Sequence, residues 1–260
     1  MASAPSLSGG VFKVNGLKFL VIKKLKRAST FKNLLRKKMV APRIKGISSS
    51  ATDLTKQNGS TPRKFYVFGP DVTGGGKGHG LVFVNEEKLL TPPRLIVKPA
   101  EGGFPALKEK PHIAYDPKLG DAPRDIEGGI SGYWFISERL KQIFETVDPE
   151  GFAFAECDYT LADGSKGPRH YLCDVVRTID AVDEEKSKLN ITISDEFVAG
   201  KQYSLLGSGV IIVFKENIVG DAHVFRTPFS GNIFCDCNLY SICKSITDLN
   251  GVRFRDATNL

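Results

Sequence analysis

The sequence has no long apolar run and little cysteine, and each shortage excludes a class of protein. No stretch of the 260 residues approaches the roughly 18 apolar residues that a membrane-spanning helix needs. Five cysteines, an odd number in a chain of this size, argue against a disulfide scaffold and favour a reducing, cytoplasmic compartment. The hydrophobic fraction of 41% is nevertheless large enough for a core, which excludes a wholly disordered chain.

Motifs that carry chemistry are missing as well. The four histidines do not have the spacing of a zinc-binding helix, and Cys235, Cys237 and Cys243 do not have the spacing of a zinc finger. Residues 73–80 are glycine-rich, but Lys77 is followed by glycine rather than by Ser or Thr, and an apolar strand comes next. No Gly-x-Ser-x-Gly elbow is present. The sequence therefore predicts no catalytic residue, no metal site and no cofactor.

The net charge of +7 conceals two segments of opposite sign. Residues 1–64 contain 15 Lys and Arg and one acid, which gives +14, whereas residues 65–260 contain 21 Lys and Arg and 28 acids, which gives −7. Such asymmetry indicates a tail or targeting segment in front of a separate fold. We expect residues 1–62 to be a basic leader with a Ser/Thr/Gly-rich linker, and residues 63–260 to be the folded domain, with two possible lobes at 63–129 and 130–260.

The leader has several interpretations. Apolar residues recur at helical spacing between positions 17 and 35 among many lysines, a pattern typical of a basic amphipathic helix, although Ser29 and Thr30 interrupt it. It could serve as a membrane-surface helix, a nucleic-acid arm or an organelle presequence. It could equally be a solvated tail, or upstream sequence from a misplaced start, with the genuine start at Met39 or nearer Arg63. We expect it to be disordered or partly helical.

Two segments of the body have the same pattern. In residues 130–154 a strand leads to Ser137, a good N-cap, then to an amphipathic helix that ends before Gly151 and a second strand. In residues 232–254 the same order recurs with Asp236 as the cap and Gly251 as the helix breaker. The offset is 99 residues before the break and 100 after it. This repetition fits an ancient duplication or independent convergence, since any such unit needs a cap and a breaker.

The rest of the body is rich in strand patterns, including an apolar run at 209–214 that predicts a buried strand. The predicted fold class is therefore α+β, with a mostly antiparallel sheet of eight to ten strands and two principal helices in strand–helix–strand units.

These units resemble a family of bacterial immunity proteins. The segment Tyr133–Leu140, the strand at 152–154, the segment Tyr171–Asp174 and the closing Gly251–Phe254 are similar to the myxobacterial-type immunity domain, formerly a domain of unknown function, that is found beside polymorphic toxins. The resemblance covers residues 63–260, and the leader departs from the family's pattern. It implies a cytoplasmic protein that binds and occludes a cognate toxin without catalysis, so no catalytic residue carries over.

An acidic body fits a basic toxin as the partner. Candidate contacts come from two charge clusters in predicted loops: Asp116, Asp121, Asp125, Glu127, Asp183, Glu184 and Glu185. A second hypothesis is a nucleic-acid- or membrane-associated module that works through residues 1–40, and a third is an enzyme whose residues converge only in the fold. The sequence identifies no small-molecule substrate and no oligomeric state.

Overall fold

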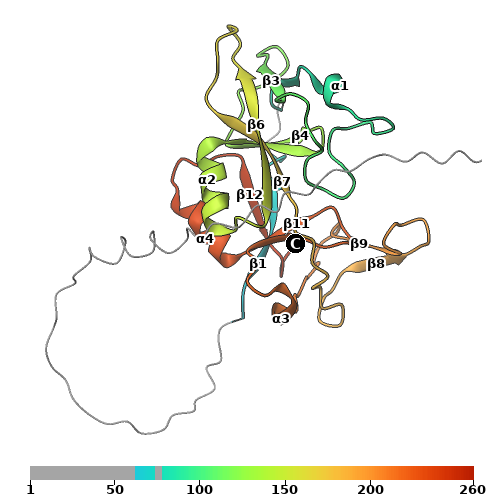
Figure 1. Cartoon of the computed structure of the whole chain (residues 1–260). Helices are drawn as coiled ribbons and strands as arrows, with labels where there is room; N and C mark the ends of the chain where they lie inside the picture. Colours follow the sequence, from blue (N-terminus) through green and yellow to red (C-terminus); the bar gives the residue numbers. More distant parts are fainter. Residues whose placement is uncertain (1–61, 74–77) are drawn as a thin grey trace, which may run out of the picture. The chain divides into compact units, whose positions relative to one another are not determined.

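The computed structural model describes residues 62–73 and 78–260 (Figure 1). The predictions made for residues 1–61 lie outside these residues. The described part is α+β, with 12 strands and 4 helices and mostly antiparallel pairing, which confirms the predicted fold class. Among the described residues, no helix has the length and apolar character required to cross a membrane.

The strands form three sheets. A four-stranded sheet has the order β10 (Val224–Arg226), β11 (Ile233–Asp236), β1 (Phe65–Pro70) and β12 (Val252–Asp256). A six-stranded sheet has the order β2 (Leu81–Phe83), β3 (His112–Tyr115), β6 (Phe152–Thr160), β7 (His170–Val175), β5 (Tyr133–Ser137) and β4 (Ile126–Ile130). The third is the hairpin of β8 (Asn190–Ile193) and β9 (Lys201–Ser204). The six-stranded sheet thus takes strands from both sides of residue 130.

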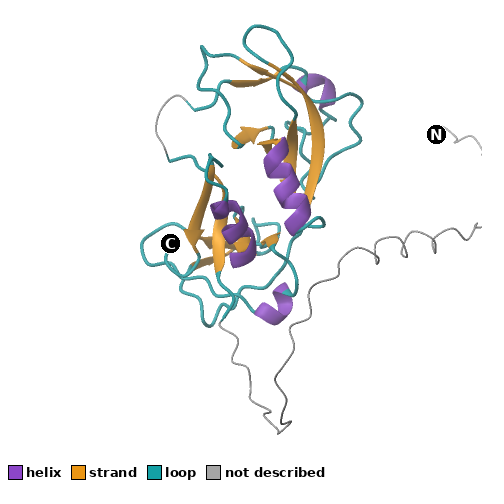
Figure 2. Ribbon diagram, turned by 90° about the vertical axis from the view of Figure 1, so that its left-hand side faces the viewer, coloured by secondary structure: helices purple, strands orange, loops and turns teal. Residues whose placement is uncertain are grey.

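Two helices are long enough to organise the fold: α2 (Glu138–Val147) and α4 (Cys237–Ser245), which pack against each other (Figure 2). The other two, α1 (Glu86–Leu89) and α3 (Glu216–Val219), have four residues each. Leu140 and Phe144 of α2 and Leu239 and Cys243 of α4 are buried in one apolar cluster. The predicted helical faces therefore meet in a common core.

Both predicted N-caps are confirmed. The Ser137 side chain accepts a hydrogen bond from the backbone N–H of Leu140, and the Asp236 carboxylate accepts from the N–H groups of Asn238 and Leu239. Each cap satisfies donors that the first helical turn leaves without a partner. Each helix thus begins where the sequence predicts.

The two strand–helix–strand units share one topology. In the first, β5 and β6 run parallel and β7 is inserted between them as an antiparallel strand; in the second, β11 and β12 run parallel and β1 is inserted. An antiparallel strand also flanks each unit, β4 beside β5 and β10 beside β11. We call β4–β5–α2–β6–β7 repeat 1, and β10–β11–α4–β12 together with β1 repeat 2.

The register of the pairing also matches. Each repeat contains a cation paired with an acid on the outer strand and placed over a tyrosine ring on the inserted strand: Arg169, Glu156 and Tyr171 in repeat 1, and Lys64, Asp256 and Tyr66 in repeat 2. The tyrosine lies directly opposite the acid in both. A cap and a breaker require neither this topology nor this register, so the repetition points to duplication rather than convergence.

One predicted strand is wrong. Val210, Ile212 and Phe214 of this run are buried as expected, but residues 209–214 form only single bridges, between Ile211 and Lys188 and between Phe214 and Val182. Their apolar side chains pack with Phe65, Phe225 and other residues in a second core cluster on repeat 2. Burial, rather than a ladder of strand pairing, accounts for this apolar run.

Candidate functional site

The predicted contact residues of the first acidic cluster have different environments. Asp125 and Glu127 are buried, Asp116 is half-buried, and Asp121 is exposed. The Asp125 carboxylate accepts hydrogen bonds from the Arg139 side chain at 2.5 Å and from the Ser137 hydroxyl at 2.8 Å. Its charge is therefore already compensated within the fold.

Glu127 is compensated in the same way. Two nitrogens of the Arg124 guanidinium, each at 2.8 Å, and the Arg124 backbone N–H at 2.9 Å donate to its carboxylate. Burial alone would raise the pKa of Glu127, but these hydrogen bonds outweigh it and hold that pKa below its usual value. The same balance, with Arg139 as the main donor, lowers the pKa of Asp125.

The second acidic cluster is split as well. Asp183 is buried and pairs with Lys186 at 3.1 Å, whereas Glu184 and Glu185 are exposed. Glu184 accepts hydrogen bonds from the Lys201 ammonium and the Tyr203 hydroxyl. Of the seven predicted residues, the structure thus leaves three exposed: Asp121, Glu184 and Glu185. Whether they contact a partner stays a prediction.

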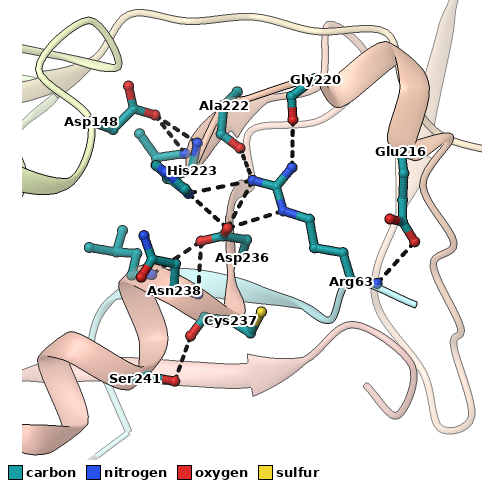
Figure 3. A network of polar contacts seen from close by, with 12 residues as sticks. Arg63, Asp148, Glu216, Gly220, Ala222, His223, Asp236, Cys237, Asn238 and Ser241 are labelled. Carbon is teal, nitrogen blue, oxygen red and sulfur yellow. Dashed lines mark hydrogen bonds and ion pairs between the residues drawn. The ribbon is translucent and has the colours of Figure 1, made fainter. Parts of the chain in front are cut away.

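A further polar network joins elements that are distant in sequence (Figure 3). The Arg63 side chain, just before β1, donates to the Asp236 carboxylate at 2.8 and 3.1 Å and to the carbonyls of Gly220 and Ala222. His223 Nδ1 lies 2.8 Å from the same Asp236 oxygen, Oδ2. The N-cap carboxylate of α4 therefore ties the start of the described chain to the segment that follows α3.

Asp148, at the end of α2, continues this network across the two repeats. Its carboxylate accepts the backbone N–H groups of His223 at 2.8 Å and Val224 at 3.1 Å, and it pairs with Arg177. Burial would raise the pKa of Asp148, but the hydrogen bonds from Arg177 and from the backbone prevail and lower it. The carboxylate therefore stays ionised while holding α2 against β10.

A cleft of about 440 Å³ lies over this network and carries an acidic rim. Asp148, Arg177 and His223 line it together with the exposed acids Glu150 and Asp221. A carboxylate-bound imidazole is the arrangement that a general base needs. The residues that line the cleft include no Ser, Thr or Cys to serve as a nucleophile, and Arg63 engages the same carboxylate. The contacts of Asp148 with His223 and Val224 join repeat 1 to repeat 2.

No local pattern in the sequence indicates this network. Asp236 was predicted only as a cap, and Arg63, Asp148 and His223 were not predicted at all. The contacts of Arg63 with Asp236 and of Asp148 with His223 join residues 173 and 75 positions apart. Among the described residues, no group of three or more His, Cys, Asp or Glu side chains is arranged to hold a metal ion. All five cysteines are free thiols, and four of them are buried.

Comparison with known proteins agrees with the resemblance seen in the sequence. A search of curated proteins gave no match. The model of one protein family, described as immunity protein family (Imm11), matches residues 64–259, which include both repeats. The prediction of an immunity-protein family is therefore confirmed, and the chain belongs to the immunity protein family Imm11.

Proposed function

We propose that this protein binds a cognate secreted toxin in the cytoplasm of the producing cell and neutralises it by occlusion, without catalysis. Family membership over residues 64–259 carries this proposal. The toxin would belong to a polymorphic toxin system, with its gene beside that of the immunity protein. Free thiols at all five cysteines suit a reducing compartment.

The charge of the folded part supports a partner with a basic surface. Residues 65–260 carry a net charge of −7, and acids such as Glu150, Asp221, Glu184 and Glu185 reach the solvent. Opposite charges across an interface increase the association rate and help to select the partner. Exposed acids that pair with no cation of the described residues, such as Glu185 and Asp221, remain available for such contacts, unlike Asp125 or Asp148.

Co-expression tests the proposal directly. The full chain is produced together with the C-terminal toxin domain encoded in the neighbouring reading frame, and growth and co-purification are measured. We expect the toxin domain to stop growth when produced alone, and growth to return when the immunity chain binds it. A toxin domain that stays lethal and does not co-purify with the full chain would disprove the proposal.

A charge variant tests the role of the three exposed predicted acids. The triple variant Asp121→Asn, Glu184→Gln, Glu185→Gln should bind the toxin more slowly and with a weaker dependence on salt. The matched control Asp163→Asn, Asp195→Asn, Glu196→Gln removes the same charge from other exposed turns. Equal binding by the two variants would show that the three predicted acids make no special contribution.

A further inference from the structure

Repeat 1 contains a buried ion cluster at one position of its inserted strand β7. The Asp174 side chain is 1% exposed and pairs with Lys98 and with Arg226 at 2.6 Å, while the Gly103 N–H donates to it at 2.7 Å. Arg226 reaches β7 from β10 of the other repeat, where its Nε also donates to the Val175 carbonyl. A carboxylate thus fills the space over β7 and forms ion pairs with two cations.

The equivalent position in repeat 2 has no side chain. The match of Tyr171 with Tyr66 places Asp174 opposite Gly69 in the alignment of the two inserted strands. In place of Arg226, β4 has an irregularity at Gly128 and Gly129, and a Cβ on Gly128 would lie 3.3 Å from Cγ of the next residue of β1, Pro70. Both the acid and the arginine of the filled cluster are therefore replaced by glycine.

An open groove of about 290 Å³ occupies this position in repeat 2. Its floor is β1 around Gly69, and a Cβ placed on Gly69 would lie 3.5 Å from Cζ2 of Trp134, at ordinary contact distance. Arg253 and Arg255 of β12 also line it. They pair across the sheet with Gly69 and Val67, so both arginines lie on the face of the sheet that contains the groove.

The two arginines lack a counter-ion within the described part of the chain. No carboxylate there lies within 4 Å of either guanidinium. Asp71 acts on Arg253 only at longer range, and its carboxylate is bound to Thr73. Burial, and then repulsion by Arg253, lower the pKa of Arg255. In repeat 1 the equivalent residues of β6 are alanines, so the charge is particular to the groove.

We propose that this groove binds a carboxylate side chain of the partner protein, which takes the position that Asp174 occupies in repeat 1. Choosing a protein as the source of the carboxylate depends on the function proposed above. Each guanidinium group is opposite in charge to a carboxylate and can donate two parallel hydrogen bonds to its oxygens. The outer edge of β12 bears no strand among the described residues, so an extended acidic segment can reach the groove beside it.

The groove carries its own spectroscopic probe, since Trp134 is the only tryptophan of the chain. The full chain is titrated with an acetylated and amidated Glu-Gly-Glu tripeptide while indole emission is recorded. We expect a saturable change in emission with this peptide and none with the isosteric Gln-Gly-Gln peptide. The same change with both peptides would overturn the proposal.

Two variants remove the site in different ways. Arg253→Gln with Arg255→Gln deletes the cations, and Gly69→Asp supplies an internal carboxylate at a position without strained backbone. Each should weaken peptide binding about tenfold or more, since charge-assisted hydrogen bonds are lost. Arg169→Gln, at an exposed arginine of repeat 1, is the matched control and should bind as the unaltered chain does. Undiminished binding by the double variant would overturn the proposal.

A titration with inorganic phosphate in place of the peptide distinguishes a site for a free anion from a site for a carboxylate of a protein. If phosphate saturates the emission change at lower concentration than the Glu peptide, the groove is a site for a free anion and the proposal fails. Capture of the co-expressed toxin domain then separates the two proposals. An unaltered chain that captures no toxin contradicts the proposed function, whereas equal capture by the unaltered chain and the Arg253→Gln, Arg255→Gln variant contradicts only the role of the groove.

Discussion

Repeats 1 and 2 have the same strand order and register but differ at one position of the inserted strand, which is Asp174 in repeat 1 and Gly69 in repeat 2. Repeat 1 fills the space above its inserted strand with Asp174 and two cations, whereas repeat 2 leaves Gly69 bare beneath two arginines without a counter-ion among the described residues. A common backbone can therefore hold a structural ion cluster in one copy and a vacant cationic groove in the other. The shared strand order and register belong to the fold, whereas the ion cluster and the groove each belong to one repeat.

The largest effect is expected from breaking the filled cluster. Asp174→Ala leaves Lys98 and Arg226 without their carboxylate in a largely buried site and should reduce the free energy of unfolding by about 3–5 kcal/mol. Gly69→Asp at the equivalent position should leave stability nearly unchanged, because a Cβ there meets Trp134 only at ordinary contact distance and the groove beyond it is open. Urea unfolding of both variants measures the difference, and equal losses would contradict the contrast between filled and vacant sites.

The two helix caps should differ by a smaller amount. Ser137→Ala removes the capping hydrogen bond and the hydrogen bond from the hydroxyl to Asp125, whose carboxylate keeps Arg139 as a donor, and should cost about 1–2 kcal/mol. Asp236→Ala removes a cap and also leaves Arg63 and His223 without their shared acceptor, so we expect a loss of about 3 kcal/mol. Thermal and urea unfolding would measure both losses. Similar losses for the two variants would show that the network around Asp236 contributes little.

The two sets of contacts that join repeat 1 to repeat 2, here called seams, predict that the free energy of unfolding depends on pH. In one seam the Asp148 carboxylate accepts the His223 N–H, and in the other the Asn250 amide oxygen accepts the Asp125 N–H at 3.1 Å. The pKa of Asp148 is lower in the folded chain than in the unfolded chain. Its ionised form therefore stabilises the fold above the unfolded pKa, and this contribution is lost as the pH falls through the folded pKa.

Asp148→Asn removes the ionisable carboxylate from the first seam and should flatten part of this response, whereas the Asp125 carboxylate of the second seam, which accepts the Asn250 N–H at 2.9 Å, is retained. Between about pH 5 and about pH 3, the free energy of unfolding should fall less in the variant than in the unaltered chain. Urea unfolding at several pH values provides the test, with Asp163→Asn in an exposed turn as the control. A variant as sensitive to acid as the unaltered chain would contradict the assignment to Asp148.

The smallest effect is expected where the repeats are most alike. Lys64 with Asp256 and Arg169 with Glu156 are equivalent surface pairs, and such pairs add little because water and salt screen them. Lys64→Gln and Arg169→Gln should each leave the midpoint of urea unfolding unchanged within error. A clear shift in only one of them would show that the two pairs are not equivalent.

The comparison also explains what the sequence could and could not predict. Ser137 and Asp236 were predicted as caps, and the helices were placed correctly, because capping and helical periodicity are local signals. Insertion of β1 and β7 was not predicted, because pairing between distant strands leaves no mark in either strand alone. The apolar run at 209–214 indicated burial correctly but could not distinguish a strand from irregular backbone.

The candidate site, too, could be predicted only where the signal is local in the sequence. Counting acids found Glu127 and Asp125, but a count does not reveal that Arg124 and Arg139 fold onto them. Asp121, Glu184 and Glu185 are exposed, as the sequence predicts for acids in loops. The groove was not, because Gly69 and Arg253 are brought together only by pairing of β1 with β12.

The place of β1 in the chain has a consequence for how a new molecule is made. β1 is the first described strand to leave the ribosome, yet Phe65 pairs with Asp236, 171 residues later. At about 5–20 residues per second, that delay is roughly 10–30 s. Repeat 1 can form from a continuous segment meanwhile, whereas repeat 2 must wait until β11 and β12 have been synthesised. The groove, with its floor in β1 and its arginines in β12, can therefore form only after β12 has left the ribosome.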